Sequence, residues 1–88
     1  MLKTTTRTRS LDVLETQVSG EIMSIDWDSL PARDASRLRN FGFDEGVMVT
    51  ALHRAPFGAD PVAVRVGRMT VAIRRAHAAA VQVALPAA

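Results

Sequence analysis

The chain has 88 residues, 48% of them hydrophobic, with a formal net charge of +2 and no cysteine. This length allows one small domain with a single modest core, and the lack of cysteine excludes disulfides and thiolate metal sites. No apolar run approaches the roughly 20 residues that a membrane-spanning helix needs.

The first ten residues are polar and basic. They include four threonines, and their only charged side chains are Lys3, Arg7 and Arg9. Such a segment buries too little apolar surface to offset the entropy lost on ordering, so we expect a flexible arm over residues 1–10 and a single domain over residues 11–85. The arm lacks the apolar stretch of a secretory signal, and we therefore expect a cytoplasmic protein.

The next part of the chain mixes apolar and polar positions at short spacing. Residues 11–14 (LDVL) predict either a turn of helix or a first strand. Residues 21–27 (EIMSIDW) predict a half-buried strand in which Met23, Ile25 and Trp27 share one face, because successive strand residues point to opposite sides.

A short amphipathic helix is predicted over residues 32–41. Ala35 and Leu38 lie three positions apart and so fall on one face, while polar residues occupy the other. Gly42 is a natural stop, because glycine tolerates the left-handed conformation that often follows a helix. Phe43 is then expected to fold back as the apolar contact of that cap.

The second half of the chain is β-like. Alternating apolar residues predict four strands, a tight turn at 67–68 separates the second from the third, and an alanine-rich helix precedes the last. The strands cover residues 47–52, 62–66, 70–73 and 81–85, and the helix covers 74–80. The pattern predicts a mainly β fold, a small β-barrel of about five strands with one or two short helices.

Residues that carry catalysis or bind metal are sparse. His53 and His77 are the only histidines, and a first-row metal needs three or more converging ligands, so we expect both to be ordinary. Asp26 and Asp28 lie at a strand end, where aspartates commonly mark a turn. The glycine-rich lysine motif of a nucleotide-binding loop does not occur in the sequence. We expect no catalysis, no metal and no cofactor.

The segment 55–61 is the best candidate for a recognition element. Its prolines restrict the chain, so Pro56 and Phe57 would present an aromatic anchor at a low entropic cost. The alternative is that Phe57 folds inward and closes the end of the barrel. Arg33, Arg37 and Arg39 form a rim on the helix that would steer an acidic protein partner, and the alternative is that these side chains are simply solvated. Arg54, beside the loop, is the further arginine that we expect to contact the partner.

Nucleic acid is the rival partner. Residues 46–88 hold five arginines against one acid, Asp60, and small β-barrels bind nucleic acid through basic grooves with stacking aromatic residues. The aromatic support is poor, since the chain has no tyrosine, one tryptophan and three phenylalanines. The sequence therefore favours a protein partner and keeps nucleic acid as the alternative.

Three motifs occur in a characteristic order. They are RLRNFGF at 37–43 followed by EGV at 45–47, LHRAPFGADPV at 52–62, and VAIRRAHA at 71–78. In this order and spacing they resemble the FeoA family over about residues 20–84. Two positions depart from its usual pattern: Ala59 lengthens the loop, and His77 stands where the family usually has glutamate.

The resemblance implies both a fold and a role. The fold is an SH3-like barrel. The role is that of a small cytosolic partner of FeoB, the bacterial ferrous-iron transporter that carries an N-terminal G-protein domain. Related barrels form the C-terminal domains of metal-dependent repressors, so a stand-alone regulatory domain is a further alternative.

Overall fold

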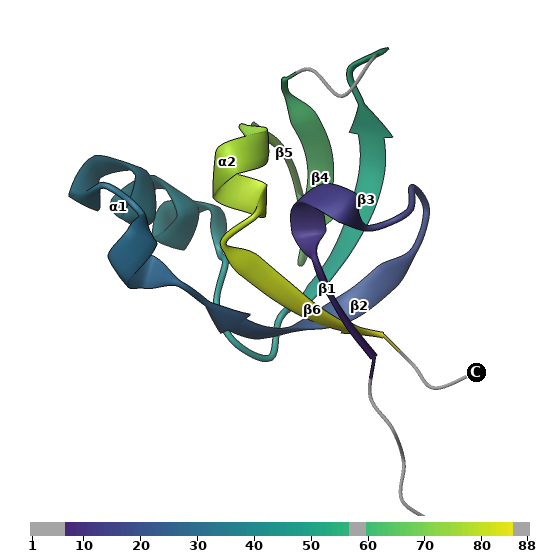
Figure 1. The fold of residues 1–88 in the computed structure, drawn as a ribbon, viewed down its shortest axis with the longest axis horizontal. Coiled ribbons are helices and arrows are strands. Elements are labelled where there is room, and N and C mark those ends of the chain that lie inside the picture. Colours follow the sequence, from purple (N-terminus) through teal and green to yellow (C-terminus); the bar gives the residue numbers. More distant parts are fainter. Residues whose placement is uncertain (1–6, 57–59, 86–88) are drawn as a thin grey trace, which may run out of the picture.

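The computed structural model describes residues 7–56 and 60–85 (Figure 1). Within those two ranges no helix has the length and apolar character needed to cross a membrane. The elements in chain order are β1 (Arg7–Ser10), η1 (Leu11–Val13), β2 (Ser19–Ile25), η2 (Trp27–Ser29), α1 (Ala32–Phe41), β3 (Met48–Arg54), β4 (Val62–Val66), β5 (Met69–Ile73), α2 (Arg75–Ala78) and β6 (Val81–Leu85).

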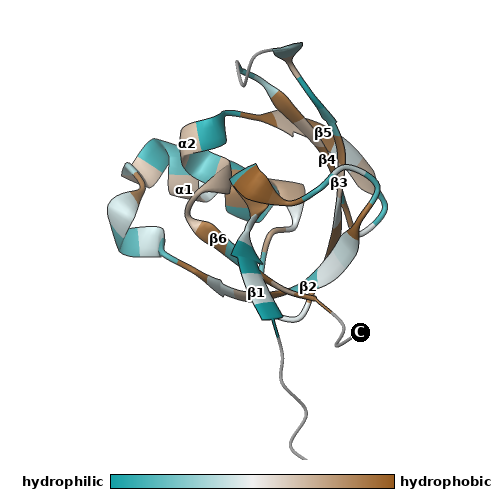
Figure 2. Ribbon diagram, turned by 45° about the vertical axis from the view of Figure 1, so that its right-hand side comes forward, coloured by the Kyte–Doolittle hydropathy of each residue, from teal (hydrophilic) through white to brown (hydrophobic). Residues whose placement is uncertain are grey.

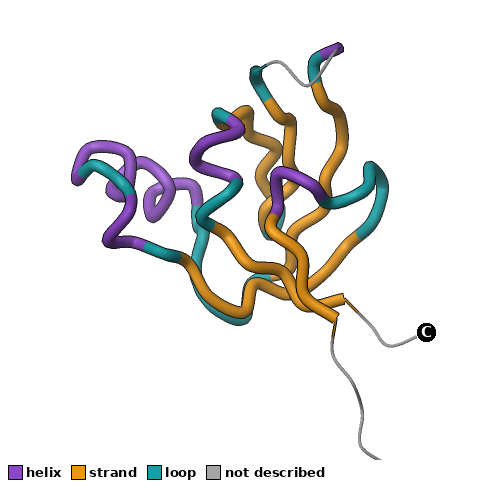
Figure 3. The backbone as a smooth tube through the Cα atoms, viewed as in Figure 1, coloured by secondary structure: helices purple, strands orange, loops and turns teal. Residues whose placement is uncertain are grey.

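The six strands form one antiparallel sheet in the order β1-β6-β2-β3-β4-β5. Figure 3 shows the curved sheet, with α1 at the left of the view and α2 and η1 near its centre. The predicted mainly β organisation with two short α-helices is confirmed. Strand β1 brings the number of strands to six, one more than the five that we expected.

The core lies on the concave side of this sheet and is purely apolar among the described residues. Strand β4 illustrates how it forms. Val62, Val64 and Val66 are at most 2% exposed, while Arg65 between them faces solvent, as period-two alternation requires. Figure 2 shows the resulting hydrophobic colouring along β4 and its neighbours.

The hairpin from β4 to β5 matches the prediction closely. Residues 67–68 form a two-residue connection, and Gly67 has a φ of 57°. Glycine at the first central position of such a turn is preferred because it adopts positive φ without a steric penalty. The turn fixes the register that places Val66 opposite Met69.

The predicted helix and its cap are also confirmed. Helix α1 begins at Ala32 and ends at Phe41, and Gly42 follows with a φ of 98°. The Phe43 backbone N–H donates to the Leu38 carbonyl at 3.0 Å, and the Phe43 side chain is only 1% exposed. The apolar contact beyond the cap fastens the helix end to the core.

The flexible arm predicted over residues 1–10 is wrong for its last four positions. Residues 7–10 form β1 and pair with residues 82–85 of β6, and residues 1–6 lie outside the described part of the chain. Three of these four side chains are exposed. Backbone pairing rather than apolar burial places the strand here, and a burial argument from composition does not detect such a contribution.

The predicted face of the first long strand is wrong as well. Ile22 and Ile25 are buried, whereas Met23 is 49% exposed. The pairing of β2 with β6 shifts between Ile22 and Ser24, as in a β-bulge. One extra residue in a strand reverses the alternation beyond it. Trp27 lies beyond the end of the strand, where it begins η2.

Candidate partner-binding groove

A groove of about 380 Å³ separates helix α1 from strand β5 and helix α2. It brings together residues that are up to 44 positions apart in the chain. Its lining combines four basic side chains with an apolar base and one acid. The lining residues are Arg33, Asp34, Arg37, Leu38, Phe41, Pro61, Ala72, Ile73, Arg74 and His77.

Helix α1 supplies one wall. Arg33 and Arg37 lie one helical turn apart, so they project from the same face. The Arg37 guanidinium carbon lies 5.7 Å from the centroid of the Phe41 ring, within the range of a cation–π contact. Leu38 is 1% exposed and ties this wall to the core.

The opposite wall is built from the end of β5 and the start of α2. Ala72 and Arg74 are exposed there, and Ile73 between them is buried. His77 Nε2 lies 3.2 Å from Asp34 Oδ2, so this contact joins the two helices that line the groove. The groove is therefore held open by packed elements rather than by a single loop.

The segment that leads into β4 is fastened to the same wall. Asp60 Oδ1 accepts a hydrogen bond from the Arg75 backbone N–H at 2.5 Å. That N–H belongs to the first turn of α2, where backbone donors have no partner within the helix. The interaction occupies one of the few acids in this part of the molecule.

The groove is electropositive. Arg33, Arg37 and Arg74 line it, while its one acid, Asp34, already contacts His77. Residues 61–88 contain four arginines and no aspartate or glutamate. Positive charge concentrated in a concave surface raises the local concentration of anionic groups and accelerates their association.

The structure separates the residues that we predicted to contact a partner. Arg33 and Arg37 line the groove. Arg39 points elsewhere, with its guanidinium carbon 4.2 Å from the centroid of the Trp27 ring. The contact roles of all of them stay predictions.

Arg54 and Pro56 lie at the far end of β3. Pro56 is exposed. Two guanidinium nitrogens of Arg54, Nε and Nη2, are buried and have no hydrogen-bond partner within residues 7–56 and 60–85. Phe57 lies outside the described residues, so neither of its two predicted roles is tested.

The two histidines lie on different elements. His53 is exposed on β3 and His77 lies on α2 against Asp34. In the described part of the chain no three histidine, aspartate or glutamate side chains gather into a group that could hold a metal ion. The expectation of no metal site stays a prediction. Asp26 and Asp28 flank and occupy the short η2 turn, as aspartates at a strand end were expected to do.

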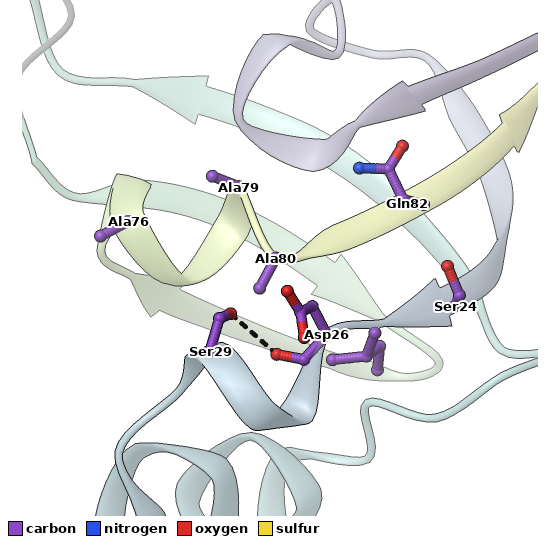
Figure 4. A pocket seen from close by; sticks show the side chains of 8 residues that line it. Ser24, Asp26, Ser29, Ala76, Ala79, Ala80 and Gln82 are labelled. Atoms are coloured by element: carbon purple, nitrogen blue, oxygen red, sulfur yellow. Dashed lines mark hydrogen bonds between the residues drawn. The ribbon is translucent and has the colours of Figure 1, made fainter.

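A second hollow lies between β2, η2, α2 and β6 (Figure 4). Its polar side chains are Ser24, Asp26, Ser29 and Gln82. Helix α2 contributes Ala76, and the residues just after the helix contribute two more alanines. The Ser29 hydroxyl donates to the Asp26 carbonyl at 2.9 Å. The hollow contains one charged side chain, so it offers less to an ionic partner than the groove beside β5.

Sequence reasoning missed one half of the groove. Arg74 enters the sequence analysis only as one of the five arginines of residues 46–88 in the nucleic-acid alternative, and Asp34 has no predicted role. A signal did exist, because Arg74 directly follows a predicted strand that ends a hairpin, and a strand end next to a helix commonly lines a cleft. What the sequence does not contain is the placement of α1 beside that strand.

A family model described as the FeoA domain matches residues 9–85 of the chain. This range begins within β1 and ends with β6, so it includes the whole sheet except the first two residues of β1. No curated protein matches the chain. The similarity therefore extends well beyond the motifs from which the resemblance was drawn.

Several solved structures share the fold. FeoA from Stenotrophomonas maltophilia in complex with zinc, described as a prokaryotic SH3 domain protein, is 33% identical, with 86% of this chain and 88% of that chain covered and a TM-score of 0.68. A FeoA protein from Chlorobium tepidum is 25% identical, with 91% and 71% covered and a TM-score of 0.74.

A manganese-dependent transcriptional repressor also matches, with 18% identity, 92% of this chain and 43% of that chain covered, and a TM-score of 0.77. At that identity the similarity shows a common fold alone. Together with the observed sheet, these structures confirm the SH3-like fold that the resemblance implied.

Proposed function

Because this chain belongs to the FeoA family, we propose that it is a small, non-catalytic accessory protein of bacterial ferrous-iron uptake. It acts in the cytoplasm by binding the cytosolic part of a FeoB-type transporter. Binding biases the transporter between conformations, which requires that one conformation be bound more tightly than the other.

The basic groove is the observation that carries this proposal. It offers a built surface with three arginines in fixed positions, two of which are among the residues that the sequence singled out. Guanidinium groups pair with carboxylates in a bidentate geometry. A protein partner with an acidic patch therefore fits this surface better than a neutral one.

Calorimetric titration of the protein into the purified G-protein domain of the cognate FeoB tests the proposal. The titration is run without nucleotide, with GDP and with a GTP analogue, each at two salt concentrations. We expect binding that weakens as salt rises, because charge pairs at an interface rim are screened. A lack of detectable heat in every nucleotide state at tens of micromolar would contradict the proposed partner.

Two double variants with reversed charges test whether the partner contacts the groove. The double variant Arg33→Glu/Arg37→Glu is expected to bind at least about tenfold more weakly. The matched control is Arg7→Glu/Arg9→Glu, which makes the same change in net charge on exposed residues of β1. Equal weakening in both pairs would indicate a general charge effect and no specific role for the groove.

The nucleic-acid alternative receives less support. Among the described aromatic residues, Phe43 is buried, and Trp27 and Phe41 are half-buried, with arginines over the rings of the latter two. Binding of single strands by small barrels depends on rings that are free to stack on bases. A protein partner therefore remains the proposal.

A further inference from the structure

Strand β5 carries unused backbone hydrogen-bonding groups as well as a neighbouring charge. It is the last strand of the sheet, and within the described ranges no strand pairs with its outer side. In an antiparallel ladder, alternate residues turn both N–H and C=O away from the partner strand. Because Val66 and Met69 close the two-residue turn, Thr70 and Ala72 are the residues that present these groups outwards.

The C-terminal end of β5 borders the groove. Ala72 and Ile73 line it from the strand, and Leu38 and Phe41 line it from helix α1. The base of the groove is therefore apolar. Its rim is basic, since Arg33 and Arg37 border it on the helix side and Arg74 borders it at the end of the strand.

We propose that this groove accepts an extended segment of the partner protein, in which acidic and apolar residues alternate, and that the segment adds as a further strand beside β5. The proposal rests on the proposed function and specifies how the partner is held. In an extended segment successive side chains point in opposite directions. The apolar residues contact Ile73 and Phe41, and the acidic residues reach the arginines.

A helix from the partner would fit less well. All the backbone groups in the middle of a helix are already bonded within it, so a helix cannot pair with the row of donors and acceptors on β5. An extended segment pairs with that row along the five residues of β5, a length of about 17 Å. Main-chain pairing then supplies affinity, and the alternating side chains supply specificity.

Nothing on β5 itself opposes such an addition. Its sequence MTVAI contains no charged residue and no proline, and these are the features by which proteins commonly protect an exposed edge. The two acids nearby are already engaged, Asp34 with His77 and Asp60 with the Arg75 backbone N–H. The three arginines of the groove outnumber these two acids, so an incoming carboxylate meets net positive charge.

The test uses a labelled eight-residue peptide of alternating valine and glutamate, with a valine–lysine peptide of the same length as the control. Fluorescence anisotropy measures binding to the full chain, and amide hydrogen exchange reports on β5. We expect the glutamate peptide to bind at least about tenfold more tightly than the lysine peptide. We also expect it to slow exchange at the Thr70 and Ala72 amides.

Paired variants decide between the groove and the rest of the surface. Arg37→Glu/Arg74→Glu is expected to reduce binding of the glutamate peptide at least about tenfold, whereas Arg7→Glu/Arg9→Glu leaves it unchanged. Equal binding of the two peptides, unchanged binding by the groove variant, or unprotected β5 amides would each overturn the proposal. Urea unfolding of each variant verifies that it is folded.

A failure of the strand-addition proposal can be distinguished from a failure of the proposed function. If the FeoB domain binds and the β5 amides stay unprotected in that complex, the partner stands and the strand addition is wrong. If the glutamate peptide binds as expected and the FeoB domain does not, the groove accepts acidic strands and the partner is a different protein.

Discussion

The two edges of the sheet differ in the way that they meet solvent. The edge at β1 is a short strand, RTRS, with two exposed arginines. The edge at β5 is an uncharged strand, MTVAI, whose last two residues line a groove. Figure 2 shows this contrast, with hydrophilic colouring on β1 and hydrophobic colouring along β4 and β5.

This difference indicates which edge is closed to other chains. Charged side chains and short length discourage further pairing, whereas an uncharged edge invites it. An open edge on a small protein promotes aggregation unless it is sheltered. At the end of β5 the groove is bordered by α1 and α2, and we propose that this arrangement shelters the edge.

The largest effect on the free energy of unfolding is expected at Gly20 of β2. Its lack of a side chain lets β2 approach β6, the strand that pairs with the charged edge strand β1. A Cβ atom at this position would lie 2.5 Å from the Ala84 carbonyl oxygen and against the Val83 side chain. Because a backbone atom cannot easily move aside, we expect Gly20→Ala to lower the free energy of unfolding by about 3 kcal/mol. Urea unfolding measures this change.

Gly46→Ala is the matched control. Its φ of 88° makes alanine strained there, but the nearest atom to an added Cβ is 3.9 Å away. The expected loss is about 1–2 kcal/mol from backbone strain alone. Equal losses for the two variants would show that the close approach of β2 to β6 contributes little to the free energy of unfolding.

A smaller effect is expected from removing the closed edge itself. Deletion of residues 1–10 removes the four paired positions of β1 and should lower the free energy of unfolding by about 2 kcal/mol, since each hydrogen bond contributes about 0.5–1.5 kcal/mol net. Strand β6, VQVAL, then becomes an uncharged edge. We expect self-association that grows with concentration, measured by light scattering.

The variant Arg7→Thr/Arg9→Thr separates pairing from charge. It keeps the strand and removes its charges, so we expect unfolding within about 0.5 kcal/mol of wild type. Self-association should nevertheless increase, because the edge loses its protecting charges. An unchanged association state would mean that charge is not what closes this edge.

Much of the fold could be predicted from the sequence because its signals are local. The bounds of helix α1 depend on spacing and on Gly42, and the β4–β5 hairpin depends on Gly67 between alternating valines. The bulge that exposes Met23 has no such signal. It depends on how β2 meets β6, nearly 60 residues later in the chain, and alternation within one strand does not contain that information.

The residues of the candidate site likewise differ in how well the sequence predicts them. Arg33 and Arg37 were identified because helical spacing places them together. Arg74 and the open side of β5 were not, because strand order decides which edge is free, and no local pattern encodes it. Arg39 illustrates the converse, since its spacing suggests a rim, yet it lies over Trp27.

The open edge can be tested by closing it with proline. In the proposed geometry the Ala72 N–H points away from β4, so Ala72→Pro removes an outward donor without breaking the ladder. We expect a loss of about 1 kcal/mol or less in unfolding and at least about tenfold weaker binding of the valine–glutamate peptide. Ala72→Ser, which keeps the N–H, is the control. A large destabilisation by proline would show that this N–H pairs within the sheet.

The smallest effect on peptide binding is expected at Arg39, which lies on helix α1 outside the groove. Its guanidinium lies over the Trp27 ring and so links α1 to η2. Loss of an exposed cation–π contact costs about 0.5–1 kcal/mol, so Arg39→Ala should lower unfolding free energy by that amount. Arg39→Lys is expected to retain part of the contact.

The effect of Arg39→Ala on binding sharpens the comparison between the edges. Arg39 does not line the groove, so it influences the peptide only through the position of α1. We therefore expect weakening of about twofold, compared with at least tenfold for the groove arginines. A contribution from α1 packing would support β5 as an edge shaped for a partner. Weakening as large as that of Arg37→Glu/Arg74→Glu would instead place Arg39 in direct contact with the bound segment.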